Sequence, residues 1–454
     1  MTQNPDTPAA PSIEDIARAA AAVLRRNDAG SMTRAAPGLY PHMWSWDSAF
    51  IAIGLARFDV PRAIRELQSL LDAQWSTGMI PHIVFNPDEP GYFPDFDRWG
   101  TARAAARPEG VQTSGICQPP VHAIALRHIL DRGRERGGAD RAAAEEFARG
   151  SLDAWAAWHH WLASVRDPDG SGLVEIHHSW ESGFDNSPRW DAAFARIRPG
   201  DVPPFQRRDT LHVADASERP TDEEYTRYLW LVEQLKSVDY DDAAAREVVD
   251  FRVKDVFFSA VLAVASDVLA DLADEFGRTD LAPGLRDVGA RFRLGVRSTI
   301  DPETRLARDF DVRAGEWIGT ETIAGFAPLF AGASAEVTAA QTVLLRGERW
   351  MGDPRLRFPL PPSTSPASPA FRPSTYWRGP TWPFLTLLLG WAVDRGGDPD
   401  LAADLRTASL GQLADLAFGE YYQPFTGEPL GSHDQSWTAA AALEWAGELG
   451  VAAR

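Results

Sequence analysis

Apolar residues recur at helical spacing along most of the chain, and the segments differ in how far the apolar surface extends around the helix. Some segments have one apolar and one charged face, for example AAAEEFARGSLDAWAAWHHWLA and ADLRTASLGQLADLA. Others follow aromatic loops directly and are apolar almost all round: SWDSAFIAIGLA, GICQPPVHAIALRHI, SPRWDAAFARI, GPTWPFLTLLLGWA and DQSWTAAAALEWA. A helix that is apolar on every face must be surrounded by other elements. The alternation predicts an all-α fold, an (α/α)6 barrel of six helical hairpins with an inner ring inside an outer ring; an irregular helical bundle is the alternative.

The positions of the predicted elements follow from the same pattern. We expect helices over residues 13–27, 46–57, 60–75, 117–133, 139–164, 188–196, 222–237, 241–274 (one helix or two), 280–297, 335–346, 379–394, 400–416 and 435–449. Strand patterns are few, and they cover residues 80–85, 172–178, 305–312 and 349–359. Short β-hairpins and loops are therefore expected as excursions over the mouth of the barrel, where the chain enters the inner helices.

The chain shows no linker between separate domains. We expect a disordered tail at residues 1–12, followed by one catalytic barrel domain over residues 13–454. Ser12 is a suitable N-cap for the first helix. Loops near residues 80–100 and 355–377 are expected to be lids. The second loop is rich in Pro and Ser but leads into an inner helix, which favours a lid over a domain boundary.

Composition limits the classes of function. The net charge of −19 excludes nucleic acid and anionic lipid surfaces as partners, because phosphates require a basic surface. No long apolar run predicts a membrane span. The single cysteine, Cys117, excludes a disulfide and a cysteine-based zinc cluster, and no nucleotide-binding motif is present, so neither a metal nor a cofactor is expected. The N-terminus lacks a signal-peptide pattern, which predicts a cytoplasmic location; a homo-oligomer is left open.

Aromatic and acidic residues gather in the loops that precede the apolar helices. The chain has 17 tryptophans but only 8 tyrosines, and such flat rings cover the apolar faces of sugars as well as filling cores. The aromatic and acidic loops are residues 39–47, 113–120, 178–191, 374–383 and 420–437. In an (α/α)6 barrel they would converge on one pocket. They would bring together the carboxyl groups of Asp47, Glu181, Asp185, Glu420, Glu428 and Asp434.

Two isolated carboxyls beneath aromatic walls are suited to glycoside hydrolysis. One must stay protonated to give its proton to the leaving oxygen, and the other must stay ionised. Burial against rings raises the pKa of a carboxyl, so Asp185, close to two tryptophans in the sequence, suits the acid role. Helix capping is the alternative interpretation for Asp47 and Asp191, which stand at helix starts, and Asp185 itself precedes a helix that has Pro188 in its first turn.

Two remote alternatives come from other classes of protein. The segment VDYDDAAA contains Asp239, Asp241 and Asp242 in the D-x-D-D order of α/α-barrel terpene cyclases. However, Asp241 and Asp242 open a charged amphipathic segment, where acids complement the helix dipole. A non-catalytic sugar-binding protein is the other alternative, but it would be expected to lack one of the two carboxyls.

The motifs WSWDSAF, HSWESGFDNSPRWD, YWRGPTWPF and EYYQPFTGEPLGSHDQSWTAA, in this order, resemble glycoside hydrolase family 63. The resemblance covers residues 39–445 and is nearest to the short cytosolic members that hydrolyse mannosylglycerate or glucosylglycerate. It implies an inverting mechanism, in which Asp185 is the general acid and Glu420 is the general base. Glu428 lies in the same loop and is the alternative base. The resemblance gives Glu181 no role.

The same resemblance implies a sugar subsite and a glycerate subsite. The sugar would be held by the rings of Tyr40, Trp44, Trp46, Trp180, Tyr376, Trp377 and Trp382 and by the polar groups of Asp47, Gln118 and Gln435. Arg219, Tyr225 and the lid residue Tyr92 would hold the glycerate carboxylate, since arginine binds carboxylates bidentately. A surface pair of Arg219 with Glu218 or Asp222 is the alternative.

The expected substrate is therefore a small anionic glycoside. We expect hydrolysis of the α-glycosidic bond of glucosylglycerate to glucose and glycerate. A mannosylglycerate hydrolase is the first alternative, and a related α-glucosidase acting on a small oligosaccharide is the second. An oligosaccharidase would leave Arg219 without a charged ligand.

Overall fold

An inner ring of helices closes around the middle of the protein. The computed structural model describes residues 10–211 and 215–452. Within these residues, six helices contact one another in sequence around the ring, and the last returns to the first. They are α2 (Ser45–Ala56), α5 (His122–Arg136), α10 (Val256–Glu275), α12 (Ala327–Phe330), α14 (Pro383–Arg395) and α16 (Ser436–Glu448).

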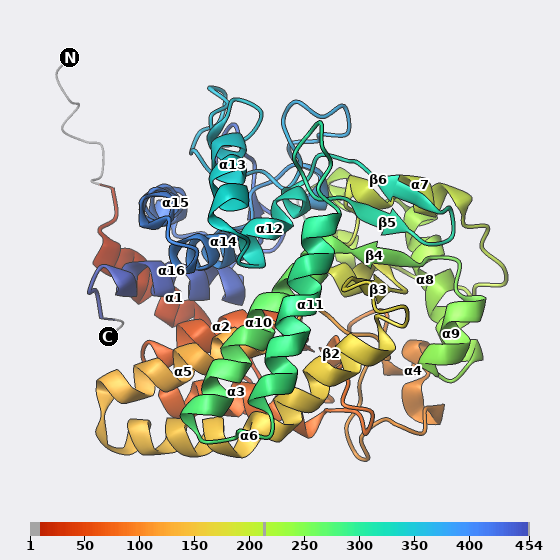
Figure 1. Cartoon of the computed structure of the whole chain (residues 1–454), viewed down its shortest axis with the longest axis horizontal. Helices are drawn as coiled ribbons and strands as arrows, with labels where there is room; N and C mark the ends of the chain where they lie inside the picture. Colours follow the sequence, from red (N-terminus) through yellow and green to blue (C-terminus); the bar gives the residue numbers. More distant parts are fainter. Residues whose placement is uncertain (1–9, 212–214, 453–454) are drawn as a thin grey trace.

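Each inner helix packs against an outer helix. The outer helices are α1 (Ile13–Arg26), α3 (Val60–Asp72), α6 (Gly138–Val165), α11 (Ala282–Ser298), α13 (Ala335–Arg346) and α15 (Pro399–Gln412). Most pairs are consecutive hairpins, such as α10 and α11, which run side by side in Figure 1. The last pair joins the two ends of the chain, since α1 packs on α16. The predicted (α/α)6 barrel is confirmed.

The two rings differ in burial, as their sequences require. Every residue of α2 is buried, whereas α1 is buried along one face only. Among the described residues, α10 alone is long and apolar enough to cross a membrane, but most of its surface is buried inside the barrel. Its apolar sequence is therefore explained by its place in the inner ring.

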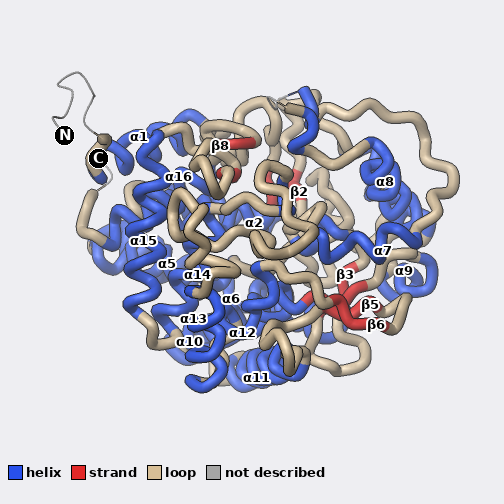
Figure 2. The backbone as a smooth tube through the Cα atoms, turned by 90° about the horizontal axis from the view of Figure 1, so that it is seen from above, coloured by secondary structure: helices blue, strands red, loops and turns tan. Residues whose placement is uncertain are grey.

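A small sheet and three helices form an excursion beside the barrel. The strands β3 (Val174–Ile176), β4 (Val253–Asp255), β5 (Asp309–Asp311) and β6 (Glu316–Ile318) make an antiparallel sheet in that order. The helices α7 (Asp191–Arg196), α8 (Asp222–Ser237) and α9 (Asp242–Val248) lie on the same side of the molecule, as both Figure 1 and Figure 2 show. This excursion carries the loop of residues 178–191, and its helix α8 contributes to one wall of the pocket.

A pair of short strands, a hairpin and a short helix lie at the mouth of the barrel. The strand β1 (Met43–Trp44) pairs with β2 (Ile83–Val84), and β7 (Tyr421–Tyr422) pairs with β8 (Pro429–Leu430). The helix α4 (Phe96–Trp99) follows β2 within the predicted lid of residues 80–100. Both pairs lie next to entrances of inner helices, since β1 directly precedes α2 and the β7–β8 hairpin precedes α16, whereas α2 and α3 separate β1 from β2 in the chain.

Several predicted boundaries are wrong for local reasons. The helix expected from residue 117 begins at His122, because Pro119 and Pro120 precede it. The helix expected from residue 379 begins at Pro383, a residue suited to the first helical turn. The segment 241–274 forms α9 and α10, with β4 between them. The segment SPRWDAAFARI was expected to be a surrounded helix, but it forms the short α7 outside the inner ring, with Asp191 and Arg196 exposed.

The strand predictions are partly correct. Three of the four predicted segments contain a strand, but residues 349–359 form turns instead. The strands β1, β4, β6, β7 and β8 were not predicted, because two or three residues are too few to show alternation. Residues 1–9 of the predicted tail lie outside the described part of the chain. Ser12 caps α1 as predicted, since its side chain accepts from the Asp15 backbone N–H at 3.1 Å.

Candidate active site

A pocket opens where the aromatic loops enter the inner helices. All five predicted loops contribute to its lining. The predicted residues that line it are Tyr40, Trp44, Trp46, Asp47, Tyr92, Gln118, Trp180, Asp185, Arg219, Tyr225, Tyr376, Glu420 and Gln435. The pocket therefore brings together residues that lie almost 400 positions apart in the chain.

Two predicted wall residues do not line the pocket. The rings of Trp377 and Trp382 stack with centroids 3.7 Å apart, and Trp382 packs edge-on against Tyr376. Both tryptophans are almost fully buried, so they support Tyr376 from behind. The prediction that these two rings cover a sugar is wrong, because a buried stack leaves no face for a ligand.

Six lining residues were not predicted. They are His82, Gly183, Asp209, Pro220, Tyr228 and Trp437. His82 lies parallel to Trp180, with ring centroids 6.3 Å apart, in the strand-like segment IPHIVF. Gly183 and Trp437 belong to the motifs HSWESGFDNSPRWD and EYYQPFTGEPLGSHDQSWTAA, so motif position was the signal for them. Pro220 and Tyr228 come from ASERPTDEEYTRYLW, the stretch that also holds the predicted Arg219 and Tyr225, whereas Asp209 lies in a segment without a motif.

Glu420 lies at the base of the pocket, directly before β7, and is 1% exposed. Its Oε1 accepts a hydrogen bond from Tyr40 Oη at 2.8 Å, and its Oε2 accepts from Arg219 Nη2 and from the Ser432 backbone N–H, both at 3.1 Å. Three donors, one of them a cation, are the surroundings that a buried carboxylate requires. Gly431 has φ of +70°, and a Cβ at this position would lie 2.4 Å from Glu420 Oε2, so the site needs glycine there.

Asp185 lies across the pocket in less polar surroundings. Burial raises the pKa of Asp185 to about 8; the charge of Glu420 adds to the rise, while Arg219 and a hydrogen bond from Tyr376 oppose it. Tyr376 Oη donates to Asp185 Oδ2 at 3.4 Å. At neutral pH this carboxyl is therefore mostly protonated and can act as a proton donor.

The loop that carries Asp185 is anchored on both sides. Asn186 Oδ1 accepts from the Trp377 backbone N–H at 2.9 Å, which joins this loop to the one that carries Tyr376. Arg189 Nη1 donates to both carboxylate oxygens of Asp309 at 3.0 Å, which joins the loop to the sheet. The motif DNSPRW thus positions the acid by contacts on either side of it.

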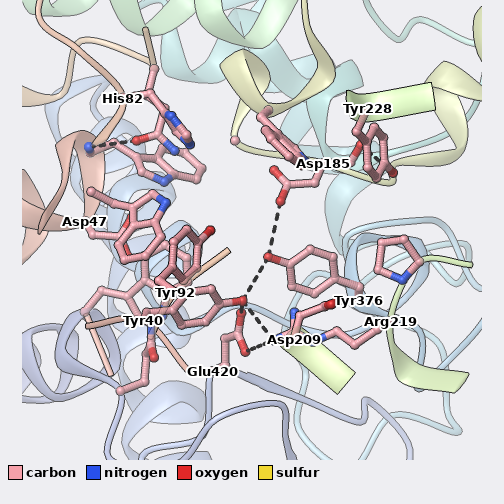
Figure 3. A pocket seen from close by; sticks show the side chains of 18 of the residues that line it. Tyr40, Asp47, His82, Tyr92, Asp185, Asp209, Arg219, Tyr228, Tyr376 and Glu420 are labelled. Carbon is pink, nitrogen blue, oxygen red and sulfur yellow. Dashed lines mark hydrogen bonds and ion pairs between the residues drawn. The ribbon is translucent and has the colours of Figure 1, made fainter. Parts of the chain in front are cut away.

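Two tyrosine hydroxyls lie between the carboxyls, as Figure 3 shows. Tyr376 Oη is 3.4 Å from Asp185 Oδ2 and 3.5 Å from Tyr40 Oη, which in turn lies 2.8 Å from Glu420 Oε1. This path limits the separation of the two carboxyl oxygens to about 10 Å, compared with roughly 6.5–9.5 Å in inverting glycosidases. The spacing is compatible with a water molecule placed between Glu420 and the sugar.

Three further predicted polar side chains, Asp47, Gln118 and Gln435, line the pocket. Asp47 stands in the first turn of α2 but does not cap it, and burial together with the charges of Glu420 and Asp185 raises its pKa well above the usual range. Gln118 Oε1 accepts from the Trp46 backbone N–H at 3.3 Å. Gln435 accepts from Ser432 Oγ at 2.7 Å, while its buried Nε2 has no partner among the described residues.

Arg219 is buried in the wall and does not lie on the surface. It is 4% exposed, and its guanidinium lies 4.6 Å above the ring of Tyr376. Its Nη2 donates to Glu420 and to Tyr40 Oη, whereas its buried Nε has no partner in the described part of the chain. The structure therefore pairs Arg219 with Glu420, in place of the alternative pairing with Glu218 or Asp222.

Tyr92 and Tyr225 line the pocket near Arg219. Tyr92 packs edge-on against Trp44, with centroids 5.2 Å apart, and comes from the predicted lid of residues 80–100. Tyr225 Oη donates to the Phe93 backbone carbonyl at 3.3 Å, which ties α8 to the same lid. The predicted glycerate-binding residues are therefore neighbours in space, although the sequence separates Tyr92 from Arg219 by more than 100 positions.

Glu428 and Glu181, the two acids without a settled role, lie outside the pocket. Glu428 is exposed in the turn between β7 and β8, so it does not have the place of a base facing the pocket. Glu181 is fully buried and pairs with Arg166 at 3.0 Å. It also accepts from the backbone N–H groups of His177 and Cys117, at 2.6 Å and 3.3 Å. Glu181 thus joins the acid-bearing loop to the loop that carries Gln118.

Polar and aromatic side chains make up the lining of the pocket. Within residues 10–211 and 215–452, no cluster of three or more His, Cys, Asp or Glu side chains is placed to hold a metal ion. Two carboxyls in contrasting surroundings, with polar groups and rings between them, can support acid–base cleavage of a glycosidic bond.

Comparisons with known proteins identify the family. Residues 40–438 match the family described as the mannosylglycerate hydrolase MGH1-like glycoside hydrolase domain. The chain is 52% identical over 437 residues to glucosylglycerate hydrolase from Mycolicibacterium hassiacum, covering 95% of this chain and 98% of that protein. It is 40% identical over 428 residues to mannosylglycerate hydrolase from Thermus thermophilus, covering 93% and 98% of the two proteins.

The match extends to a solved structure. The crystal structure of a family 63 mannosylglycerate hydrolase from Thermus thermophilus, in complex with Tris and D-glycerate, is similar with a TM-score of 0.86 and 38% identity. The similarity covers 95% of this chain and 99% of that one. The chain therefore belongs to the MGH1-like branch of glycoside hydrolase family 63 and is a glycoside hydrolase.

Proposed function

We propose that this hydrolase cleaves the α-glycosidic bond of its substrate with inversion, using Asp185 as the general acid and Glu420 as the general base. The contrast between their surroundings is the observation that carries the assignment. Burial keeps Asp185 protonated up to a pH of about 8, whereas Arg219 and Tyr40 stabilise the negative charge of Glu420. Asp185 would protonate the leaving oxygen while Glu420 takes a proton from the attacking water.

Glucosylglycerate is the substrate that the comparisons support best. The chain is 52% identical to a glucosylglycerate hydrolase but only 37–40% identical to the mannosylglycerate hydrolases that it matches. The products would be glucose and glycerate. Mannosylglycerate is the second candidate, because the similar crystal structure is that of a mannosylglycerate hydrolase.

The glycerate carboxylate would bind beside Arg219. The guanidinium uses Nη2 for Glu420 and Tyr40, which leaves donors on Nε and Nη1 for a ligand. Tyr225 and Tyr92 stand on the same side and close the subsite over the smaller part of the substrate. A buried arginine is stabilised by a negatively charged partner, so this subsite favours an anionic glycoside over a neutral oligosaccharide.

The sugar would lie against Trp44, Trp46 and Trp180, with Asp47, Gln118 and Gln435 bonding its hydroxyls. Gln435 Nε2 has an open hydrogen-bonding position, and a sugar hydroxyl would fill it. A buried donor that only the correct sugar satisfies gives strong discrimination against the wrong one.

The test compares three substrates: glucosylglycerate, mannosylglycerate and the neutral disaccharide kojibiose. Release of sugar and its first anomer are followed by NMR. We expect the highest kcat/KM for glucosylglycerate, with β-glucose appearing first. Release of sugar from kojibiose alone would refute the role of Arg219, and initial release of α-glucose would refute inversion. A preference for mannosylglycerate would leave the mechanism in place and change the sugar.

The cellular setting stays a prediction from the sequence. A cytoplasmic location and a homo-oligomer belong with this proposed function as predictions, which cell fractionation and light scattering of the purified enzyme would test. The proposed chemistry requires neither a cofactor nor a macromolecular partner, since both proton transfers use side chains of this chain.

A further inference from the structure

A line of hydroxyl groups connects the two proposed catalytic carboxyls. From Asp185 Oδ2 it passes to Tyr376 Oη at 3.4 Å, then to Tyr40 Oη at 3.5 Å, and ends on Glu420 Oε1 at 2.8 Å (Figure 3). The contacts of Tyr376 are longer than the shortest O–H···O bonds, as catalytic hydrogen bonds often are before a ligand binds. Each tyrosine hydroxyl can donate one proton and accept another. Each carboxyl group can donate a proton when it is protonated and accept one when it is ionised.

An inverting turnover leaves the acid and the base in the wrong protonation states. The acid has lost its proton to the glycosidic oxygen, and the base has gained one from water. Before the next turnover, one proton must leave Glu420 and one must reach Asp185. This requirement rests on the acid and base roles proposed above.

We propose that Tyr40 and Tyr376 return this proton from Glu420 to Asp185 and so reset the enzyme after each turnover. Glu420 gives its proton to Tyr40 Oη, Tyr40 gives its own proton to Tyr376 Oη, and Tyr376 gives its own to Asp185 Oδ2. At each tyrosine one O–H bond forms and one breaks, so both phenols end neutral. The net change is one proton moved from Glu420 to Asp185.

The charges around the line favour this direction. Arg219 Nη2 lies 3.1 Å from Glu420 Oε2 and 2.8 Å from Tyr40 Oη, so it stabilises the carboxylate that the transfer leaves behind. Among the described residues no cation contacts Asp185, and burial makes its neutral form the stable one. Burial also raises the pKa of Tyr40 and Tyr376 well above the ordinary value, so concerted transfer through neutral hydroxyls is favoured over a tyrosinate.

The backbone of Tyr376 indicates that its position matters. Its φ of 32° lies in the left-handed region, which a bulky residue rarely adopts without support from its surroundings. The rings of Trp382 and Tyr421 pack against it at 5.4 Å and 5.6 Å. A bound sugar between the carboxyls would interrupt the line, so the return step belongs to the enzyme after the sugar has left.

The test separates the first turnover from later ones. Tyr376→Phe and Tyr40→Phe each remove one hydroxyl from the line. Tyr228→Phe is the matched control, since Tyr228 lines the same pocket and its hydroxyl bonds, within the described chain, to the backbone carbonyl of Asp185 alone, at 3.5 Å. Rapid-quench assays with glucosylglycerate record the first turnover and the following linear phase, with and without added imidazole buffer, in H2O and in D2O.

We expect a burst of one sugar per active site in Tyr376→Phe and in Tyr40→Phe, followed by a linear phase slower by about tenfold or more. Imidazole should accelerate the linear phase of these two variants, and the solvent isotope effect should appear in that phase. The control Tyr228→Phe should show no burst. A first turnover slowed as much as later ones, or a burst that imidazole does not change, would overturn the relay, because sugar contacts or product release would then explain the loss.

The same assays distinguish failure of the relay from failure of the proposed function. Asp185→Asn and Glu420→Gln should abolish the first turnover itself. If either variant kept a normal first turnover, the acid and base assignment would be wrong, and the relay would fall with it. If both lost it while the tyrosine variants showed no burst, only the relay would be refuted.

Discussion

Replacing Glu181 with glutamine should destabilise the protein by about 3 kcal/mol, although the side chain is not in the pocket. Each carboxylate oxygen accepts from Arg166 and from two further donors: Oε1 from the N–H and Sγ of Cys117, and Oε2 from the backbone N–H groups of His177 and His178. An amide keeps the size but turns an NH2 group toward one of these donor sets. Arg166 would also lose its buried counter-charge.

The magnitude follows from the pKa of Glu181. Burial alone would raise it, but the charge of Arg166, the charge of His177 and the hydrogen bonds together outweigh burial and lower the pKa from 4.5 to about 2. The difference corresponds to about 3 kcal/mol at neutral pH. Removing one partner of a buried ion pair typically costs about 3–5 kcal/mol, which agrees. Because the folded pKa is the lower one, this contribution is present above pH 4.5 and is lost as the pH falls toward 2.

Urea unfolding followed by tryptophan fluorescence measures the effect. The control is Asp153→Asn, which breaks the exposed pair with Arg278 and should leave stability unchanged, since the Asp153 side chain is 72% exposed. The difference in unfolding free energy between wild type and Glu181→Gln should shrink as the pH falls from 4.5 toward 2. The kcat of the variant should be about tenfold lower than that of wild type, because the loop that carries Asp185 shifts. A variant as stable as wild type at neutral pH would refute this account of the ion pair.

Three further predictions concern the pocket. For wild type, kcat/KM should fall about tenfold per pH unit above a pH of about 8, because Asp185 must be protonated to act; an alkaline limb centred below a pH of about 6 would contradict this. Arg219→Lys should raise KM for glucosylglycerate by about tenfold or more, since lysine cannot bind a carboxylate bidentately; initial rates with kojibiose are the comparison, and an equal rise there would count against the assignment. Gly431→Ala should lower kcat by about tenfold to a hundredfold, because a Cβ would lie 2.4 Å from Glu420 Oε2. Circular dichroism should show that this last variant folds, and an unchanged kcat would show that the carboxylate tolerates displacement.

Four inner helices were predictable because their environment is recorded in their own residues: α2, α5, α14 and α16. The segment SPRWDAAFARI was expected to be another, but it forms α7 in the excursion, and α12 was not predicted. A segment such as α2 is apolar on every face, and only a surrounded helix can bury all of it. Element ends were less predictable where proline intervened, as before His122. The strand predicted at residues 349–359 failed because a short β-like composition also suits turns, and pairing partners decide between them.

The site was predictable in outline and not in depth. Motifs placed Asp185 and Glu420 in loops that meet, but they could not show that Trp377 and Trp382 stack on each other instead of facing the pocket. Glu428 resembles Glu420 in sequence context, yet it is exposed in a turn. Such differences arise from the direction in which a side chain points, and a loop sequence does not determine that direction.

The sequence by itself determined the helical class, the barrel and the loops that converge, because periodicity and motif order are local properties of the chain. It proposed two catalytic carboxyls within those loops. Only the tertiary structure decided the electrostatics. Arg219 pairs with Glu420, although the two residues lie far apart in the chain. Arg166 neutralises Glu181, and this pair depends on the direction in which the loop points the two side chains. Charge interactions depend on distance and burial, and both are known only once the chain has folded.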